Sequence, residues 1–116
     1  SPRELVKRGG FVLMACLALH DKAAPDKAFS AWLPLIEKGA RDERTFVKKG
    51  VSWALRAIGR RNEALNAAAV ATAERLAGSG EPAARWVGKD AVRELVSPKV
   101  RAALARRAGR KRRLTA

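Results

Sequence analysis

The stretch Asp42-Glu-Arg-Thr-Phe-Val-Lys-Lys-Gly-Val-Ser-Trp-Ala-Leu-Arg-Ala-Ile-Gly-Arg-Arg61 lies near the middle of the 116-residue chain. Its apolar residues recur at steps of three and four, which is the period of one buried helix face. These residues are Val47, Val51, Ala54, Leu55 and Ile58. The stretch therefore predicts an amphipathic helix over about residues 43–59, with Asp42 as its N-terminal cap.

Trp53 lies well off the centre of this apolar stripe. At 100° per residue it shares a face with three cationic side chains, Lys49, Arg56 and Arg60. An indole among cations on an accessible face suits a polyanion, or a cationic group held beside one. The alternative is a tryptophan that packs beneath the next helix while its cationic neighbours are solvated, and periodicity alone favours neither.

Composition favours a small all-α protein with an anionic partner. Alanine is abundant, and no stretch alternates as a half-buried strand would. Of the net charge of +14, residues 97–116 hold eight Lys and Arg and no acid, which leaves +6 for residues 1–96. Both parts are basic, and a basic protein of this size favours nucleic acid over a small neutral ligand.

Cys16 and His20 are the only cysteine and the only histidine. They give no zinc-binding spacing and no disulfide, so we expect no metal and no cofactor, and a reducing cytoplasmic location. A thiol–imidazole pair at this spacing would lack a third group, and a buried thiol is the simpler interpretation of Cys16. The apolar run Phe11–Leu19 is too short to span a membrane and lacks a cleavage-site pattern.

Five further helices are predicted from apolar spacing and from capping residues. Their expected ranges are 2–19, 25–38 with a kink at Pro34, 63–77 with Asn62 as cap, 81–96 with Trp86 inward, and 98–108. The remaining residues, 109–116, are rich in like charges and are expected to form a disordered tail after a domain of residues 1–108. The first helix is apolar almost all round, so we expect a preceding segment to cover it.

An internal repeat links the first, third and fifth of these helices. Leu5-Val-Lys-Arg-Gly9 matches Phe46-Val-Lys-Lys-Gly50 at a spacing of 41, and Arg85-Trp-Val-Gly-Lys89 matches them weakly at a further spacing near 40. Helix pairs that repeat every forty or so residues predict a HEAT-like solenoid of about six helices in antiparallel pairs. Such stacking places Arg8 and Lys49 in equivalent positions, as part of a basic stripe that could follow a phosphate backbone.

The same segments resemble the DNA alkylation repair family, the HEAT-like-repeat alkylpurine DNA glycosylases. The resemblance rests on Glu4–Arg8 with the following apolar run, on Phe46–Arg56 with its Trp-x-x-Arg ending, and on Ala84–Leu95. Together these segments span most of residues 4–96. The resemblance implies a protein that binds duplex DNA and excises cationic N3- and N7-alkylated purines without flipping them into a pocket.

The resemblance also implies roles for individual residues. Trp53 matches a tryptophan of the DNA-facing cleft, Arg8 a cleft arginine that grips phosphate beside the lesion, and Arg56 a basic residue near the backbone. Aromatic faces stabilise positive charge on the departing base and sugar. The expected phosphate-binding residues are Lys7, Lys48, Lys49, Arg56 and Arg60.

The family's catalytic aspartate and a further cleft tryptophan lie N-terminal to the Arg8 helix, where this sequence has no counterpart. None of Asp21, Asp26, Asp42 and Asp90 matches that motif, and Asp90 is interpreted as a partner of Arg93 or of the Arg56 side. No catalytic residue is therefore assigned, and we expect the catalytic acid upstream. The full-length family protein would be a monomeric DNA N-glycosylase. A non-catalytic nucleic-acid-binding module and a scaffold for an acidic protein remain alternatives.

Overall fold

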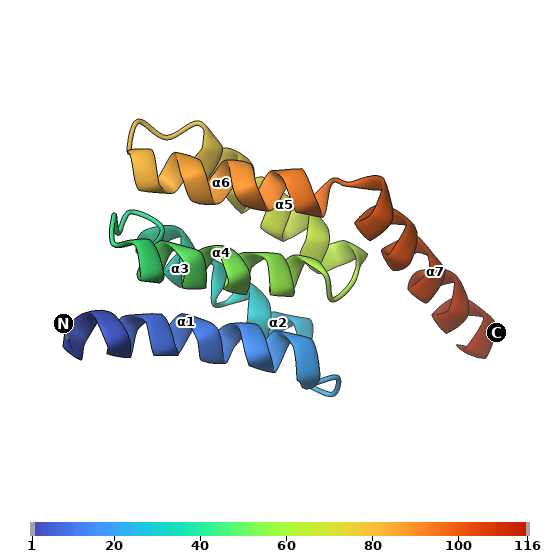
Figure 1. Ribbon diagram of the computed structural model, residues 1–116. Coiled ribbons are helices and arrows are strands. Elements are labelled where there is room, and N and C mark those ends of the chain that lie inside the picture. The colour runs from blue at the N-terminus through green and yellow to red at the C-terminus, as the bar shows by residue number, and fades with distance from the viewer. Residues whose placement is uncertain (1, 116) are drawn as a thin grey trace.

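Seven α-helices make up the computed structural model, which describes residues 2–115 (Figure 1). They are α1 (Pro2–His20), α2 (Asp26–Ser30), α3 (Leu33–Gly39), α4 (Thr45–Gly59), α5 (Glu63–Ala77), α6 (Pro82–Leu95) and α7 (Pro98–Thr115). No strand occurs within this range. The prediction of an all-α protein is confirmed.

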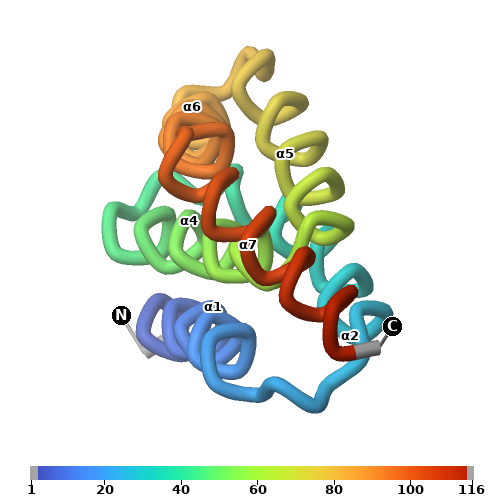
Figure 2. The backbone as a smooth tube through the Cα atoms, turned by 90° about the vertical axis from the view of Figure 1, so that its right-hand side faces the viewer, coloured from blue at the N-terminus to red at the C-terminus, as the bar shows by residue number. Residues whose placement is uncertain are grey.

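The helices form two layers, as a helical repeat requires. Helices α1, α4 and α6 lie side by side in one layer, and α2, α3 and α5 return behind them (Figures 1 and 2). Helix α4 occupies the middle, because it packs against α1 on one side and α6 on the other. Helix α7 belongs to neither layer and crosses the end of the stack (Figure 2).

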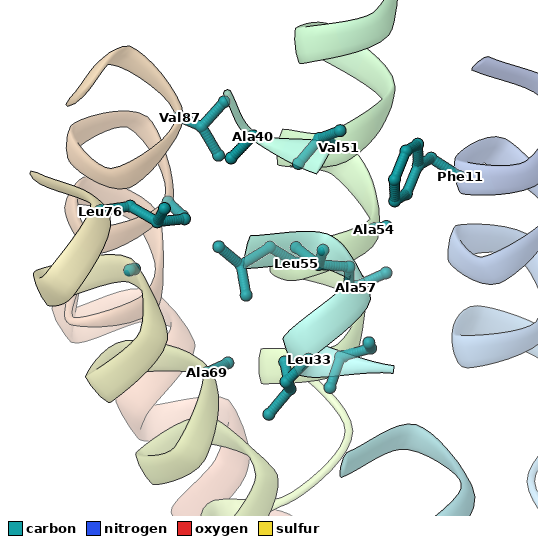
Figure 3. Close-up of a cluster of buried hydrophobic side chains, with 14 of the residues drawn as sticks. Phe11, Leu33, Ala40, Val51, Ala54, Leu55, Ala57, Ala69, Leu76 and Val87 are labelled. Atoms are coloured by element: carbon teal, nitrogen blue, oxygen red, sulfur yellow. The ribbon is translucent and has the colours of Figure 1, made fainter. Parts of the chain in front are cut away.

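Helix α4 buries the stripe that the sequence predicts. Val47, Val51, Ala54, Leu55 and Ile58 are all fully buried. Figure 3 shows Val51, Ala54 and Leu55 within the cluster of apolar side chains, and Phe11 of α1 directed toward α4. The hydrophobic burial of this one helix therefore joins both layers around it.

The expected single helix over 25–38 is two short helices, α2 and α3, and the prediction is wrong at this point. The break falls at Ala31 and Trp32, two residues before Pro34. Pro34 has no backbone N–H to donate, so it is tolerated only in the first turn of a helix, and it occupies that position in α3. The ring of Trp32 then contacts Phe29 edge-on, with 5.2 Å between ring centroids.

Arg61 joins the end of α4 to the loop that follows α1. Its guanidinium donates hydrogen bonds to the carbonyls of Ala18 (2.7 Å), Asp21 (2.8 Å) and Ala24 (3.2 Å). The same group lies 3.9 Å from the ring centroid of Phe29. A planar group with five donors suits this arrangement, because it satisfies several loop carbonyls at once.

Only one side of α1 is covered. Phe11, Ala15 and Ala18 are buried, whereas Leu5, Val6, Leu13 and Leu17 are exposed. Cys16 is half-buried, so the expectation of a buried thiol is wrong. The reason is that α4 is the principal neighbour of α1 and takes up a single stripe of its surface.

Helix α7 continues to Thr115, so the helix end predicted near Ala108 is wrong. Arginine, lysine, leucine and alanine are all strong helix formers, and cations in a last helical turn interact favourably with the helix dipole. These preferences outweigh the repulsion between like charges on which the expectation of disorder rested. Ala116 lies outside the described residues, and the division into a 1–108 domain and a tail stays a prediction.

Candidate nucleic-acid interface

The open side of α4 carries Trp53 and its cationic neighbours. Trp53 is 37% exposed, and Lys49 and Arg60 are exposed beside it. Helices α1 and α6 flank α4, and the second layer lies behind it (Figure 2). Because these side chains are exposed, they lie on the remaining, free face of α4. Trp53 is therefore accessible and is not packed beneath the next helix.

Phe46 joins this face at the boundary between α1 and α4. Phe46 is 59% exposed, and the Arg8 guanidinium lies 5.8 Å from its ring centroid. Sequence reasoning missed Phe46 as a site residue, although a signal was present: Phe46 precedes Trp53 by seven residues, or two helical turns, and so shares its face. The structure thus brings Arg8 to an aromatic side chain of the neighbouring helix.

A second cation–aromatic pair lies between α4 and α6. Lys48 Nζ is 5.3 Å from the ring centroid of Trp86. Trp86 is 39% exposed, so the prediction that it points inward is wrong. The two pairs are related by a shift of 40 residues in both partners, from Arg8 to Lys48 and from Phe46 to Trp86. The structural repeat therefore pairs Arg8 with Lys48, whereas the sequence match at a spacing of 41 pairs it with Lys49.

Three of the cations expected to bind phosphate are engaged with carboxylates. Lys7 Nζ lies 3.0 Å from Asp42 Oδ2, and Arg60 Nε lies 3.0 Å from Glu94 Oε2. Arg56 Nη1 donates to Glu94 Oε1 at 3.0 Å. A phosphate at these positions would compete with an ion pair that is already formed.

The remaining cations of the predicted set are Arg8, Lys48 and Lys49. Within residues 2–115, no carboxylate is paired with any of them. Arg8 and Lys48 instead lie over the aromatic rings of Phe46 and Trp86. The cations of this set that have no carboxylate partner thus lie at both helix boundaries of the face, Arg8 between α1 and α4 and Lys48 between α4 and α6, and the phosphate-binding role of each residue stays a prediction.

A polar network joins α4 to α6. The Ser52 hydroxyl donates to Asp90 Oδ2 at 2.6 Å, and Arg56 Nε donates to the Ser52 carbonyl at 3.3 Å. Arg56 Nε also lies 3.8 Å from Asp90 Oδ2, and Arg93 lies 3.8 Å from Asp90 Oδ1. The interpretation of Asp90 as a partner of these cations is confirmed.

Asp42 is not the cap of α4, so that prediction is wrong. The helix begins at Thr45, and Asp42 Oδ1 accepts the Arg44 backbone N–H at 2.9 Å, as in a turn that precedes a helix. Hydrogen bonds from the Arg44 side chain, with help from Lys7, hold the pKa of Asp42 well below its usual range. Asp42 therefore stays charged and ties α1 to the start of α4.

Two features bear on other kinds of site. Within residues 2–115, no group of three or more His, Cys, Asp or Glu side chains is placed to hold a metal ion. In the same range, no helix has both the length and the apolar character needed to cross a membrane.

The family of the chain follows from its similarity to known proteins. A model of the family described as "DNA alkylation repair enzyme" matches residues 1–95, which is most of the chain. The chain belongs to the DNA alkylation repair enzyme family. The resemblance that the sequence motifs indicate is thus confirmed. No curated protein and no solved structure matches the chain significantly.

Proposed function

We propose that this protein acts in DNA repair by binding duplex DNA that contains a cationic N3- or N7-alkylated purine and by promoting loss of that base. Membership of the DNA alkylation repair enzyme family supports DNA as the substrate. The observation that carries the proposal is the exposure of Trp53 on the free face of α4, beside cations that have no carboxylate partner among the described residues.

An alkylated, cationic purine is already a good leaving group, so the protein needs mainly to stabilise the positive charge that develops on the sugar. When the N-glycosidic bond breaks, the alkylated purine leaves with the bonding electrons and becomes neutral, while positive charge develops on the deoxyribose until water adds. An indole face attracts such a cation electrostatically. Arg8 and Lys49 would hold the flanking phosphates, so that the reacting sugar stays beside Trp53.

A second candidate is a non-catalytic DNA-binding module, and one observation favours it. Asp90 and Glu94 are the carboxylates of α6 that face α4, and both are paired with Arg56. Asp90 also accepts the Ser52 hydroxyl hydrogen. A carboxylate engaged in this way is a poor base for activating water.

Methylated duplex DNA separates the two candidates. The protein is incubated with DNA methylated at purine nitrogens, and free 7-methylguanine and 3-methyladenine are measured by liquid chromatography. Release above the spontaneous rate supports the glycosylase. Binding to the same duplex without release supports the binding module, and the absence of both would overturn the proposal.

Trp53→Ala tests the role of the indole. Cation–π energies of about 0.5–2 kcal/mol predict release that is roughly 2- to 30-fold slower, with a smaller effect on affinity for undamaged duplex. Trp53→Phe keeps an aromatic face and serves as the control, with partial activity expected. An unchanged release rate in Trp53→Ala would show that the indole has no part in the reaction.

A further inference from the structure

A cleft of about 880 Å³ lies between α7 and the C-terminal ends of α1 and α4. Figure 2 shows why it forms: α7 crosses the end of the two layers from the α6 side toward α2. The cleft is therefore at the end of the stack, whereas Trp53 lies on the open face of α4. The family match ends at residue 95, so it does not include α7.

One wall of the cleft is a regular stripe of α7. The lining residues on this helix are Val100, Ala103, Leu104, Arg107, Ala108 and Lys111, which follow the spacing of a single helix face. Val100 and Leu104 are buried, and Arg107 donates hydrogen bonds to the carbonyls of Arg60 (2.5 Å) and Arg61 (3.3 Å). These contacts hold the stripe against the body, while Ala108 stays partly exposed.

The opposite wall has an apolar floor and a cationic rim. Apolar side chains, including Leu19, Ala57 and Ala64, line the floor. Lys22 lies on this side and Lys99 on the α7 side, and neither has a carboxylate partner within residues 2–115. Apart from Arg60, which is paired with Glu94, and Lys111, the cations that line the cleft are Lys22, Arg61, Lys99 and Arg107, against two acids, Asp26 and Glu63.

Of these two acids, Asp26 already accepts a hydrogen bond from Asn62 Nδ2 at 2.8 Å. The excess of cations therefore calls for an acidic occupant, and the apolar floor calls for one with apolar side chains. Duplex DNA would use the cations alone, because it presents phosphates and no apolar side chains to the floor.

We propose that this cleft docks an acidic amphipathic helix of a partner protein. Such a helix would place small apolar side chains on the floor and carboxylates beside Lys22 and Lys99. The stripe from Val100 to Lys111 is about 17 Å long at 1.5 Å per residue, which corresponds to about three turns of a bound helix. The cleft lies at the end of the stack and adjoins the Trp53 face at Arg60, which lines the cleft.

The test uses a fluorescein-labelled synthetic peptide of about 15 residues, with Leu and Ala on one helical face and Glu on the other. Fluorescence anisotropy with the whole chain should show binding to this peptide and none to a version with Lys in place of Glu. Alanine-methyl NMR should then show shifts at Ala103 and Ala108, which line the cleft, and none at Ala73 or Ala91, which are buried elsewhere. Shifts confined to residues outside the cleft would overturn the proposal.

Two matched double variants locate the site. Lys22→Glu with Lys99→Glu reverses the rim and should weaken peptide binding by about tenfold or more. Arg106→Glu with Arg110→Glu makes the same change in net charge at exposed α7 positions that do not line the cleft, and should leave binding within about twofold.

Equal weakening in both double variants would reveal attraction by net charge alone and would overturn the proposal. So would displacement of the peptide by undamaged duplex DNA in the unmodified protein, since that result would assign the cleft to nucleic acid. Circular dichroism of each variant confirms that it is folded. Excision of alkylated bases is measured separately on the same proteins, so loss of peptide binding and loss of repair activity can be told apart.

Discussion

Glycine and alanine differ by one methyl group, and that group has opposite consequences at two positions of this protein. At Gly88 a Cβ atom would collide with the backbone of Ala73 and Ala77, because α6 approaches α5 closely there. At Gly9, in α1, no atom lies within 4 Å of the position that a Cβ would take. The first glycine is required by packing, and the second only lowers helix propensity.

We therefore expect Gly88→Ala to destabilise the protein by about 1–3 kcal/mol, the usual range for an overpacked core. Gly9→Ala should stabilise it by up to about 1 kcal/mol, since alanine is the better helix former. Urea unfolding followed by circular dichroism measures both free energies of unfolding. Equal effects of the two substitutions would mean that α5 and α6 do not approach closely at Gly88.

Individual site residues could be predicted only in part from the sequence. The exposure of Trp53 was among the interpretations that helical spacing allowed, since it lies off the apolar stripe of α4. Phe46 and Trp86 were missed or misplaced, because an aromatic residue beside apolar neighbours resembles a core residue until its neighbouring helix is located. In the structure Arg8 and Lys48 lie over these two rings from the neighbouring helices, a contact between helices that helical spacing within one helix does not reveal.

At the scale of elements, α5 was predicted with the correct bounds, because Asn62 marks its start: its side chain accepts the Leu65 N–H at 2.8 Å. Helix α4 begins two residues later than expected, since Asp42 forms a turn with Arg44 and not a cap. The break before α3 and the length of α7 were missed. The break depends on the position that Pro34 takes in the first turn of α3, and the length of α7 depends on helix propensity outweighing charge repulsion. A pattern of apolar residues contains neither kind of information.

Arg60 and Arg61 are adjacent but make different contacts: Arg60 pairs with Glu94 of α6, and Arg61 donates to backbone carbonyls at the end of α1. Substituting each by lysine should show how much each set of contacts contributes to stability. Arg61→Lys loses a planar group that satisfies three carbonyls, one in the last turns of α1 and two in the loop after it, and we expect a loss of at least about 2 kcal/mol. Arg60→Lys alters one partly exposed ion pair to Glu94 and should cost less than about 1 kcal/mol.

Thermal unfolding of the two variants at the same pH measures this difference. A similar loss of stability in both would mean that the contacts of Arg61 with the loop carbonyls contribute little. Because Arg60 has the same charge and the adjacent position, the comparison removes effects of net charge and of helix propensity at the end of α4.

At the scale of the whole molecule, the 40-residue repeat was enough to predict two layers, because each helix pair must bury its apolar faces against the next pair. The path of α7 could not be predicted in this way. It depends on the seating of Val100 and Leu104 and on the bonds from Arg107 to the end of α4. No repeat in the sequence relates these contacts to the earlier helices.

The net charge of +14 makes any DNA affinity depend on salt. The positions of the cations in the two layers predict which of them contact phosphate. Arg8→Ala should weaken duplex binding and reduce the slope of log K against log salt by about one. Lys27→Ala makes the same change in net charge from α2, in the opposite layer, and should leave the slope unaltered. Titrations over a series of salt concentrations check both variants, and equal slopes would argue against a phosphate contact at Arg8.

The carbonyl contacts of Arg61 also determine how the protein should behave toward trypsin. A protease that cleaves after arginine must draw the side chain into its own pocket and extend the backbone around it. Arg60-Arg61 is a dibasic sequence at a surface turn, yet the Arg61 side chain is occupied and the Arg60 and Arg61 carbonyls accept bonds from Arg107. In the native protein, the α4–α5 junction should therefore resist cleavage longer than the exposed loops that hold Lys22 and Arg41.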